Sequence, residues 1–373
     1  MKAPLLILLC LLITACSGTG TTHGPGEGDT LRLEHAQRLT IVRCDGYTQV
    51  TLADPWNEGR VLHTYLLVPA DGDVPPHLPK GTIVRTPLRR SVIATSVHCG
   101  LLQSFGKEKS IGGVCDVQYI HLPFVEQGCK DGSIADCGSA LAPAVEKVLD
   151  LQPDAIFLSP FQNSGGYGRV EEIGIPIIEM AEYMESSPLG RAEWMRFYGL
   201  LFGAEAQADS IFRQVEADYE ALREQAAKAT SQCTVLMDKM TGSVWYVPGG
   251  NSTIGHVIAD AHCGYAWADD THSGSLSLPF ETVLEKAAQA DVWLFRFNAD
   301  HPISPTELLS EHRGYDQFRA FQTGRLYGCN TATSTFYEET PFHPERLLRD
   351  FVTIAHPELG LGEPKYFLRL KEQ

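Results

Sequence analysis

The sequence is poor in positive charge. Its 373 residues include 30 Lys and Arg against 46 Asp and Glu, a formal net charge of −16. Such a chain repels phosphate backbones, so we expect no nucleic acid among its partners. No block of like charges stands out, which places the acidity on solvated faces and would favour docking onto a basic partner.

Long apolar runs are also missing. The apolar stretch from Ala3 to Ile13 covers about a dozen residues, too few to cross a bilayer. It follows Met1-Lys2 and ends in Ile13-Thr14-Ala15-Cys16, a pattern typical of a signal peptide that resembles a bacterial lipobox. The resemblance implies cleavage before Cys16 and lipidation of its thiol. An ordinary signal peptide with a chance cysteine is the alternative.

The first thirty residues therefore predict an exported protein. We assign residues 1–15 to a signal peptide and residues 16–30, rich in Gly, Ser and Thr, to a flexible tether. The mature chain is expected in the periplasm, held to a cell-envelope membrane by its lipid.

The chain has no Cys-x-x-Cys motif, which argues against thioredoxin-like chemistry and a zinc ribbon. Export would permit disulfides among the cysteines that follow Cys16, although a local Cys129–Cys137 bridge and buried free thiols fit the sequence equally well. These eight cysteines are Cys44, Cys99, Cys115, Cys129, Cys137, Cys233, Cys263 and Cys329.

Motifs for catalysis are missing as well. There is no His-Glu-x-x-His, and the 13 histidines include no pair at i, i+4 spacing. The glycine-rich stretch 100–107 has the wrong spacing for a phosphate-binding loop. We therefore predict no catalytic residue, no cofactor and no resident metal. A metal-ion site would need His98, His262 and His343 to converge from distant loops.

The remaining pattern is an alternation of strands and helices. Residues 31–80 read as short strands separated by turns, which predicts an antiparallel extension. Strand-like and helix-like segments then alternate over the rest of 31–185 and again over 231–373, which predicts two α/β lobes with largely parallel sheets. Among them are helix-like segments at 97–105 and 344–355 and strand-like segments at 111–114, 234–237 and 292–297. Between them, residues 186–230 carry one apolar stripe at helical spacing, opened by Ser187 and Pro188. The stripe predicts one long spine helix, or two helices broken near Gly203.

This order of segments resembles the lipoproteins that bind substrate for ABC importers of iron-siderophores, haem and cobalamin. The resemblance covers about residues 80–356 and rests on five segments whose order is more specific than any one of them. They are Val145 to Ile156, Gly174-Ile175-Pro176, Pro188 to Trp194, Phe280 to Leu284 with Ala290 to Trp293, and Phe342-His343-Pro344. The extension at 31–80 and the eight cysteines depart from the usual pattern; the extension would brace the first lobe or shape the cleft.

The resemblance implies roles for individual residues. Glu146 and Glu281 fall where the family has one exposed glutamate on each lobe for docking into the permease. The ligand would bind between the lobes, against loops that follow strands and carry aromatic and basic side chains. The candidate ligand-binding residues are Ser96, His98, Phe161, Tyr167, Trp245, Tyr246, Arg296 and Tyr337.

The resulting hypothesis is a monomeric, lipid-anchored binding protein that captures a metal chelate and passes it to ABC permease subunits. An iron-siderophore is the first expectation, with cobalamin and haem next. Two alternatives remain open at this point: a binding protein for free zinc, manganese or iron ions, and an exported enzyme on the same scaffold.

Overall fold

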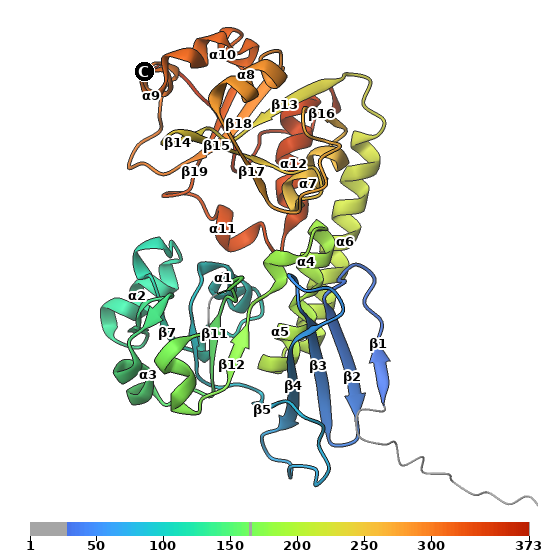
Figure 1. Ribbon diagram of the computed structural model, residues 1–373, viewed down its shortest axis with the longest axis vertical. Coiled ribbons are helices and arrows are strands. Elements are labelled where there is room, and N and C mark those ends of the chain that lie inside the picture. The colour runs from blue at the N-terminus through green and yellow to red at the C-terminus, as the bar shows by residue number, and fades with distance from the viewer. Residues whose placement is uncertain (1–27, 164–165, 373) are drawn as a thin grey trace, which may run out of the picture.

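A computed structural model describes residues 28–163 and 166–372. Two α/β lobes lie one above the other, joined along one side by helices, with an additional sheet beside the lower lobe (Figure 1). The predicted signal peptide and Cys16 fall outside the described residues. Within the described part of the chain, no helix has the length and hydropathy needed to cross a membrane.

The N-terminal lobe is built on a parallel sheet. Its strands are ordered β12-β11-β6-β7-β8 and every neighbouring pair is parallel. The strands are β6 (Ser91–Ile93), β7 (Ile111–Val114), β8 (Ala135–Asp136), β11 (Ala155–Leu158) and β12 (Ile177–Glu179). The main helices are α1 (Ser96–Ser104), α2 (Pro123–Asp131) and α3 (Val145–Leu151). The central strands β6, β7 and β11 are fully buried, which explains why they are continuous apolar or small-residue runs.

The C-terminal lobe repeats this plan. Its main sheet is ordered β16-β13-β18-β19-β20, parallel except for the last pair. The strands are β13 (Cys233–Met237), β16 (Cys263–Tyr265), β18 (Val292–Phe297), β19 (Leu326–Asn330) and β20 (Leu368–Arg369). A small antiparallel sheet joins β14 (Met240–Thr241), β15 (Val244–Pro248) and β17 (Ser275–Leu278). The helices are α7 (Thr253–Asp260), α8 (Phe280–Ala287), α9 (Pro305–Glu311), α10 (Arg319–Gln322), α11 (Phe336–Glu339) and α12 (Pro344–Ala355).

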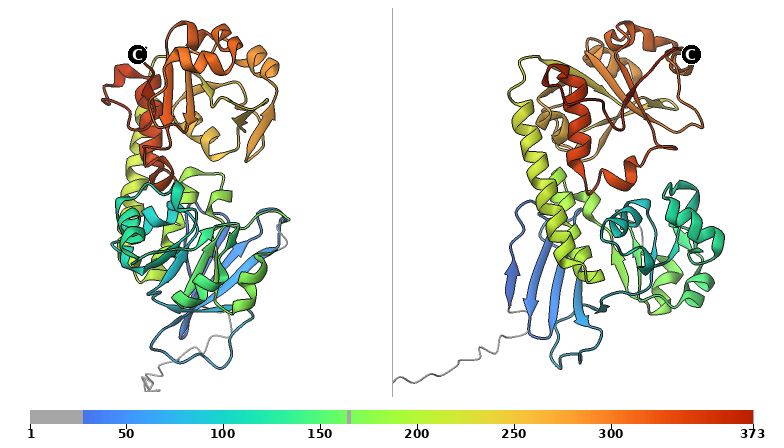
Figure 2. Two further views of the ribbon diagram at one scale, coloured as in Figure 1. Left: turned by 90° about the vertical axis from the view of Figure 1, so that its left-hand side faces the viewer. Right: turned by 180° about the vertical axis from the view of Figure 1, so that it is seen from behind.

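The predicted spine consists of three helical pieces. They are α4 (Pro188–Glu193), α5 (Met195–Phe202) and α6 (Glu205–Ala226). The Ser187 hydroxyl accepts a hydrogen bond from the Gly190 N–H at 3.0 Å, which confirms the predicted start. The break near Gly203, one of the two predicted alternatives, is present because Gly203 adopts a left-handed φ of +60°. The second break, at Trp194, was not expected. Seen from behind, α12 runs alongside α6 (Figure 2).

The N-terminal extension is a five-stranded sheet ordered β1-β2-β3-β4-β5. Its strands are β1 (Asp29–Leu31), β2 (Leu39–Cys44), β3 (Tyr47–Ala53), β4 (Val61–Pro69) and β5 (Thr82–Thr86). The first four are antiparallel, as predicted, but β5 pairs with β4 in parallel. The parallel pair corrects the expectation of a purely antiparallel extension. It arises because the long 70–81 connection carries the chain back to the start of β4.

The eight cysteines between Cys44 and Cys329 are all free thiols, five of them buried. Cys99 and Cys115 lie in the N-terminal core, where burial raises the pKa of each thiol. Cys129 and Cys137, which could have closed a local loop, are not bridged. The cysteines therefore serve as small apolar side chains in this structure.

Candidate ligand-binding cleft

A cavity of about 420 Å³ opens at the carboxyl edge of the C-terminal sheet. It begins where β13 ends at Met237 and where β18 ends at Phe297. In α/β proteins, ligands bind in crevices at this edge because loops diverge there and leave space. The cavity is lined by Asp238, Lys239, Thr241, Tyr246, Ser275, Arg296, Phe297, Asn298, Ala299, Ile303, Glu311 and Tyr337.

The cavity lies on the side of this lobe that faces the N-terminal lobe. Tyr337, one of its walls, belongs to α11, the short helix between the two lobes (Figure 1). Helix α11 contacts α1 of the N-terminal lobe. A smaller cavity of about 260 Å³ is shared by these two helices, with Gly100 and Leu101 on one side and Glu338 and Glu339 on the other.

An ion pair forms the floor of the cavity. Arg296 donates from Nε to Asp238 Oδ1 at 3.0 Å and from Nη2 to Asp238 Oδ2 at 2.6 Å. Burial by itself would lower the pKa of the Arg296 guanidinium, but the charge of Asp238 and the hydrogen bonds to it outweigh burial and raise that pKa. Arg296 is therefore a permanent cation whose charge is matched by its partner.

The backbone holds Asp238 in place. Asp238 adopts a left-handed φ of +57°, its N–H donates to the Leu294 carbonyl at 2.7 Å, and its own carbonyl accepts from Trp293 Nε1 at 2.6 Å. Aspartate tolerates this conformation better than most residues. The carboxylate that meets Arg296 is thus positioned before any ligand arrives.

Two exposed tyrosines flank the ion pair. Tyr246 is 45% exposed and Tyr337 is 44% exposed, unusually high for large aromatic side chains. Both line the cavity, together with Phe297, the last residue of β18. Flat, accessible rings beside a satisfied ion pair suit a ligand that presents apolar area as well as hydrogen-bond acceptors.

The structure thus brings Tyr246, Arg296 and Tyr337 together, although they are far apart in the sequence. Phe297 and Asn298 fall in the candidate loop predicted to begin at Arg296, whereas the remaining cavity residues were missed by sequence reasoning. For Asp238 and Lys239 a signal was available, because they directly follow the strand predicted at Thr234 to Met237. Glu311 and Ile303 gave no comparable signal, since they belong to a helix and a loop that pack against the cavity only in the folded lobe.

Trp245 does not belong to the cavity. Its side chain is fully buried, and its Nε1 donates to the Met237 carbonyl at 2.9 Å. The ring stacks on Trp293 with centroids 5.5 Å apart. Because neighbouring residues of a strand point to opposite faces, Tyr246 is exposed while Trp245 enters the core. We correct its expected role from ligand binding to core packing.

Three candidates from the N-terminal lobe, Ser96, Phe161 and Tyr167, follow the carboxyl ends of β6 and β11. Ser96 opens α1 and is partly buried, and Phe161 is exposed in the loop after β11. Tyr167 is partly buried, with its hydroxyl donating to Glu179 Oε1 at 3.2 Å. None of them lines the 420 Å³ cavity. Phe161 is the one whose ring is clearly available to a ligand.

His98 belongs to α1 and is buried in the protein interior rather than in the cleft. It is buried, and its Nδ1 is 2.8 Å from the Thr95 hydroxyl. Its Nε2 is 3.5 Å from Glu182 Oε2, which also accepts a hydrogen bond from the Tyr198 hydroxyl at 2.9 Å. This arrangement makes His98 part of a buried polar cluster where α1 meets the spine.

The other metal candidates do not converge on His98. His262 follows α7 in a left-handed turn near His356, and His343 precedes α12 with its Nδ1 3.0 Å from Glu345. Among the described residues, no three His, Cys, Asp or Glu side chains gather in a way that could hold a metal ion.

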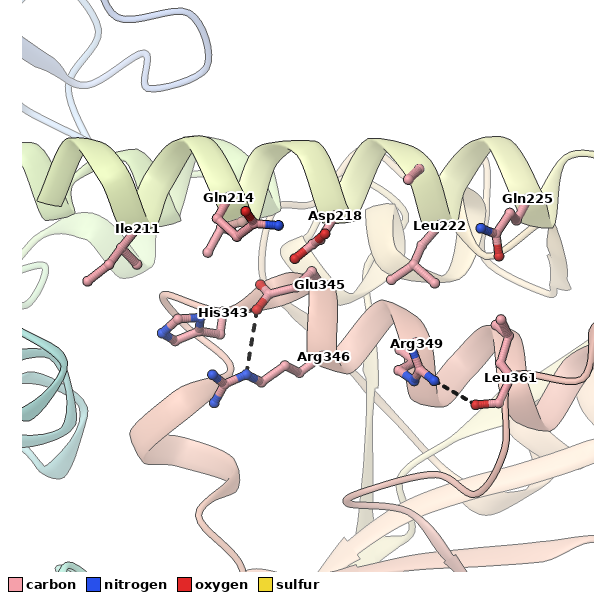
Figure 3. A pocket seen from close by; sticks show the side chains of 12 residues that line it. Ile211, Gln214, Asp218, Leu222, Gln225, His343, Glu345, Arg346, Arg349 and Leu361 are labelled. Atoms are coloured by element: carbon pink, nitrogen blue, oxygen red, sulfur yellow. Dashed lines mark hydrogen bonds and ion pairs between the residues drawn. The ribbon is translucent and has the colours of Figure 1, made fainter. Parts of the chain in front are cut away.

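A larger cavity, about 610 Å³, lies between α6 and α12 (Figure 3). Three of its charged side chains are engaged with neighbours: Arg346 Nε is 3.5 Å from Glu345, and Arg349 donates to the Leu361 carbonyl at 2.7 Å. It is a groove between packed helices and receives no strand end. We therefore place the candidate site in the smaller cavity that faces the other lobe.

Glu146 and Glu281 occupy equivalent places in the two lobes. Each is the second residue of its helix, in α3 and α8, and each is exposed. Each helix leads into a central strand, β11 or β18. The two helices lie toward opposite ends of the molecule (Figure 1). Arg169 Nη2 lies 3.6 Å from Glu146 Oε1. Because both side chains are exposed to solvent, this ion pair is weak and leaves the carboxylate available to a partner.

Solved structures with the same fold are binding proteins. A periplasmic haem-binding protein from Pseudomonas aeruginosa matches with a TM-score of 0.59 and 15% identity, covering 77% of this chain and 99% of that one. A molybdate-binding protein from Haemophilus influenzae has a TM-score of 0.59 and 14% identity over 74% and 88% of the two chains. A siderophore-binding protein from Vibrio cholerae, solved with Fe³⁺-Desferal, has a TM-score of 0.52 and 15% identity over 72% and 99%.

Similar sequences come from Methanocaldococcus jannaschii. One uncharacterised lipoprotein is 27% identical over 76% of this chain and 69% of its own length. A second uncharacterised lipoprotein is 25% identical over 85% of this chain and 84% of its own length. The periplasmic binding protein family matches residues 114–333, which span the whole spine and a large part of each lobe. With its two α/β lobes, its helical spine and a cavity that faces the opposite lobe, this chain belongs to the periplasmic binding protein family.

Proposed function

We propose that this protein is the lipid-anchored binding component of an ABC importer, and that it captures a metal chelate. The observation that carries the proposal is the cavity beside Arg296, where two exposed tyrosines flank a fixed ion pair on the wall facing the other lobe. An iron-siderophore is the first candidate, with cobalamin and haem next. The protein changes no covalent bond.

The neighbours of this fold support a chelate as cargo. Their names include haem, a ferric hydroxamate transport system, vitamin B12 and Fe³⁺-Desferal. These ligands share a metal enclosed by a broad organic frame, which matches a cavity with accessible rings. The two lipoprotein relatives support an anchor, for which Cys16 is the residue we propose.

Delivery would use both lobes. We propose that Glu146 and Glu281 dock into basic pockets of the permease, one from each lobe. Two separated carboxylates can pair with arginines only when their spacing fits, so docking would report the relative position of the lobes. The equivalent positions of the two glutamates in α3 and α8 support this role.

The test is a calorimetric titration of the full-length chain in mild detergent. The panel contains ferric hydroxamate and catecholate siderophores, haem, cyanocobalamin, and free zinc, manganese and iron ions. Saturable submicromolar binding of a chelate, with no response to free ions, is expected. A response to a free ion alone would replace the proposal with the metal-ion alternative, and silence across the panel would overturn it.

Two neighbouring substitutions locate the site. Tyr246→Ala should weaken binding of the responding chelate by roughly tenfold or more, because an exposed ring of the cavity is lost. Trp245→Phe is the matched control: it should lower the free energy of unfolding and leave affinity unchanged, because Trp245 is buried in the core. If Trp245→Phe weakened binding and Tyr246→Ala did not, the ligand would not bind in this cavity.

A further inference from the structure

Four charged side chains line the cavity, and they form two pairs. Within the described residues these are Asp238, Lys239, Arg296 and Glu311. Arg296 is paired with Asp238, and Lys239 Nζ is 2.5 Å from Glu311 Oε2. The formal charge of the cavity wall is therefore zero. A cleft built to hold an anion would instead leave at least one cation unmatched.

A ligand carboxylate cannot easily replace Asp238 as the partner of Arg296. Both oxygens of Asp238 are engaged by the guanidinium, and Asp238 is itself nine-tenths buried and fixed through its backbone. An anion that drew Arg296 away would leave this carboxylate buried without a partner, which is strongly unfavourable. An anion that left the pair intact would lie close to the negative charge of Asp238.

Arg296 still offers hydrogen bonds to a neutral ligand. The pair uses Nε and Nη2, and Nη1 has no acceptor among the described residues. Its N–H groups can donate to carbonyl or hydroxamate oxygens without any change in the ion pair. The cavity therefore offers hydrogen-bond donors but no net charge, which suits a ligand with many uncharged hydrogen-bond acceptors.

Two further features favour positive charge over negative. The faces of Tyr246 and Tyr337 are negative in their quadrupole and attract a cation that comes to rest on them. The whole chain, at a formal −16, attracts cations and repels anions at long range. Both effects disfavour an anionic ligand, as does the absence of an unmatched cation in the cavity wall.

From these observations we infer that the cargo is a neutral or cationic chelate, of the class in which neutral oxygen donors or an amide-bearing macrocycle enclose the metal. Chelates bearing free carboxylates or a multiply charged catecholate shell are excluded. The inference rests on the proposed function, because it concerns the same cavity. It narrows that function to one class of cargo.

The inference can be tested with sets of chelates that share one organic frame and differ in net charge. Ferric desferrioxamine B carries a pendant ammonium and a net charge of +1, its N-acetyl derivative is neutral, and its N-succinyl derivative is −1. Cyanocobalamin and its monocarboxylic acid give a neutral and an anionic corrinoid. For the frame that binds, the neutral or cationic member should bind about tenfold or more tightly than the anionic one at low salt.

Removing one carboxylate should alter the preference. Glu311→Gln leaves Lys239 unmatched at the rim, so the anionic member should gain about tenfold in affinity relative to the cationic or neutral one. Glu224→Gln makes the same change of charge on the exposed face of α6, outside the cavity, and should leave the ratio unchanged. If both variants changed this affinity ratio equally, the preference would come from the net charge of the protein, and the inference about the cavity would be wrong.

The outcomes separate the inference from the function on which it rests. If the anionic member of a series binds as well as the neutral one, the charge inference is wrong and the proposed function stands. The same conclusion follows if haem or a ferric tris-catecholate binds while both series are inert. If no chelate binds, the proposed function fails, and the charge inference fails with it.

Discussion

At the scale of single residues, several charged and polar groups are buried together around Glu182. Its carboxylate is buried, accepts from Tyr198, and lies 3.5 Å from His98 and 3.7 Å from Arg191. Burial alone would raise the pKa of Glu182, but the charges of His98 and Arg191 and the hydrogen bond from Tyr198 lower it to about 2. The cluster joins α1 to the base of the spine.

We expect Glu182→Gln to lower the free energy of unfolding at pH 7 by about 3–5 kcal/mol, because it leaves buried positive charge uncompensated. The lowered pKa means that Glu182 stabilises the fold fully above its ordinary value of 4.5 and progressively less as pH falls toward 2. The difference between wild type and variant, measured by urea denaturation, should therefore shrink between pH 5 and 2. Exposed Glu172→Gln is the control, and an unchanging difference over this range would contradict the linkage.

At the scale of elements, the contact between α1 and α11 sets how closely the lobes approach. Gly100 lies where α1 meets α11, and a Cβ added there would be 2.5 Å from the Glu338 carbonyl oxygen. Glycine is used at this position for close approach of two backbones rather than for an unusual φ. A side chain here would push the elements of the two lobes apart.

Gly100→Ala should therefore open the cleft and cost about 1–3 kcal/mol of stability. Small-angle scattering should report a larger radius of gyration, and thermal unfolding a lower Tm. Gly72→Ala is the control, because its added Cβ would make ordinary contacts at 3.5 Å or more. A variant with unchanged dimensions would show that this contact does not limit closure.

The extension is fastened to the spine by two buried glutamates. Glu193 accepts hydrogen bonds from the backbone N–H groups of Glu34, His35 and Ala36 at 2.8–3.1 Å. Glu185 accepts from the N–H groups of Gln37 and Arg38 and from Trp194 Nε1. The loop between β1 and β2 thus caps the junction of α4 and α5. Of the two roles left open by the sequence, bracing is the one that these contacts support.

Glu193→Gln should loosen this junction. The amide would present its NH₂ group to backbone donors and lose charge-assisted hydrogen bonds, at a cost of about 2–4 kcal/mol. Limited proteolysis should then cut first within residues 32–38, ahead of both lobes. Glu34→Gln, on the exposed side of the same loop, should keep the wild-type cleavage pattern. Early cleavage within a lobe instead would contradict a bracing role.

At the scale of the whole molecule, three features limit how far the lobes can move. The spine of α4, α5 and α6 crosses between them, α12 packs on α6, and Thr253 of the C-terminal lobe donates to the Glu185 carbonyl at 3.1 Å. Packed helices move by small shear or hinge displacements, unlike lobes joined by extended strands. A small change in the distance between lobes would still alter the separation of α3 and α8.

Docking through these helices gives a prediction for transport. The double variant Glu146→Ala, Glu281→Ala should abolish uptake of the bound chelate by cells carrying the cognate importer, with binding in solution unchanged. Each single variant should retain part of the uptake, because one lobe can still dock. Glu172→Ala is a control that removes an exposed carboxylate elsewhere on the N-terminal lobe. Uptake that survives the double substitution would reject these two glutamates as docking residues.

The class of fold could be predicted from the amino-acid sequence alone. Local periodicity identified the segments that became α1, β7, β18 and α12, and Ser187 followed by Pro188 placed the start of the spine. These features are visible without a structure because helical and strand patterns, caps and breaks depend on residues a few positions apart. The order of segments was sufficient to indicate the family.

The role of each chemical group, in contrast, follows from contacts that form only in the folded molecule. The tertiary structure paired Arg296 with Asp238, 58 residues away, and so turned a candidate ligand-binding arginine into half of a neutral pair. It sent Trp245 into the core and left Tyr246 in the cleft, and it gathered Glu185 and Glu193 under the loop between β1 and β2. Burial and ion pairing depend on contacts between distant segments, and local sequence does not specify which distant segment will arrive.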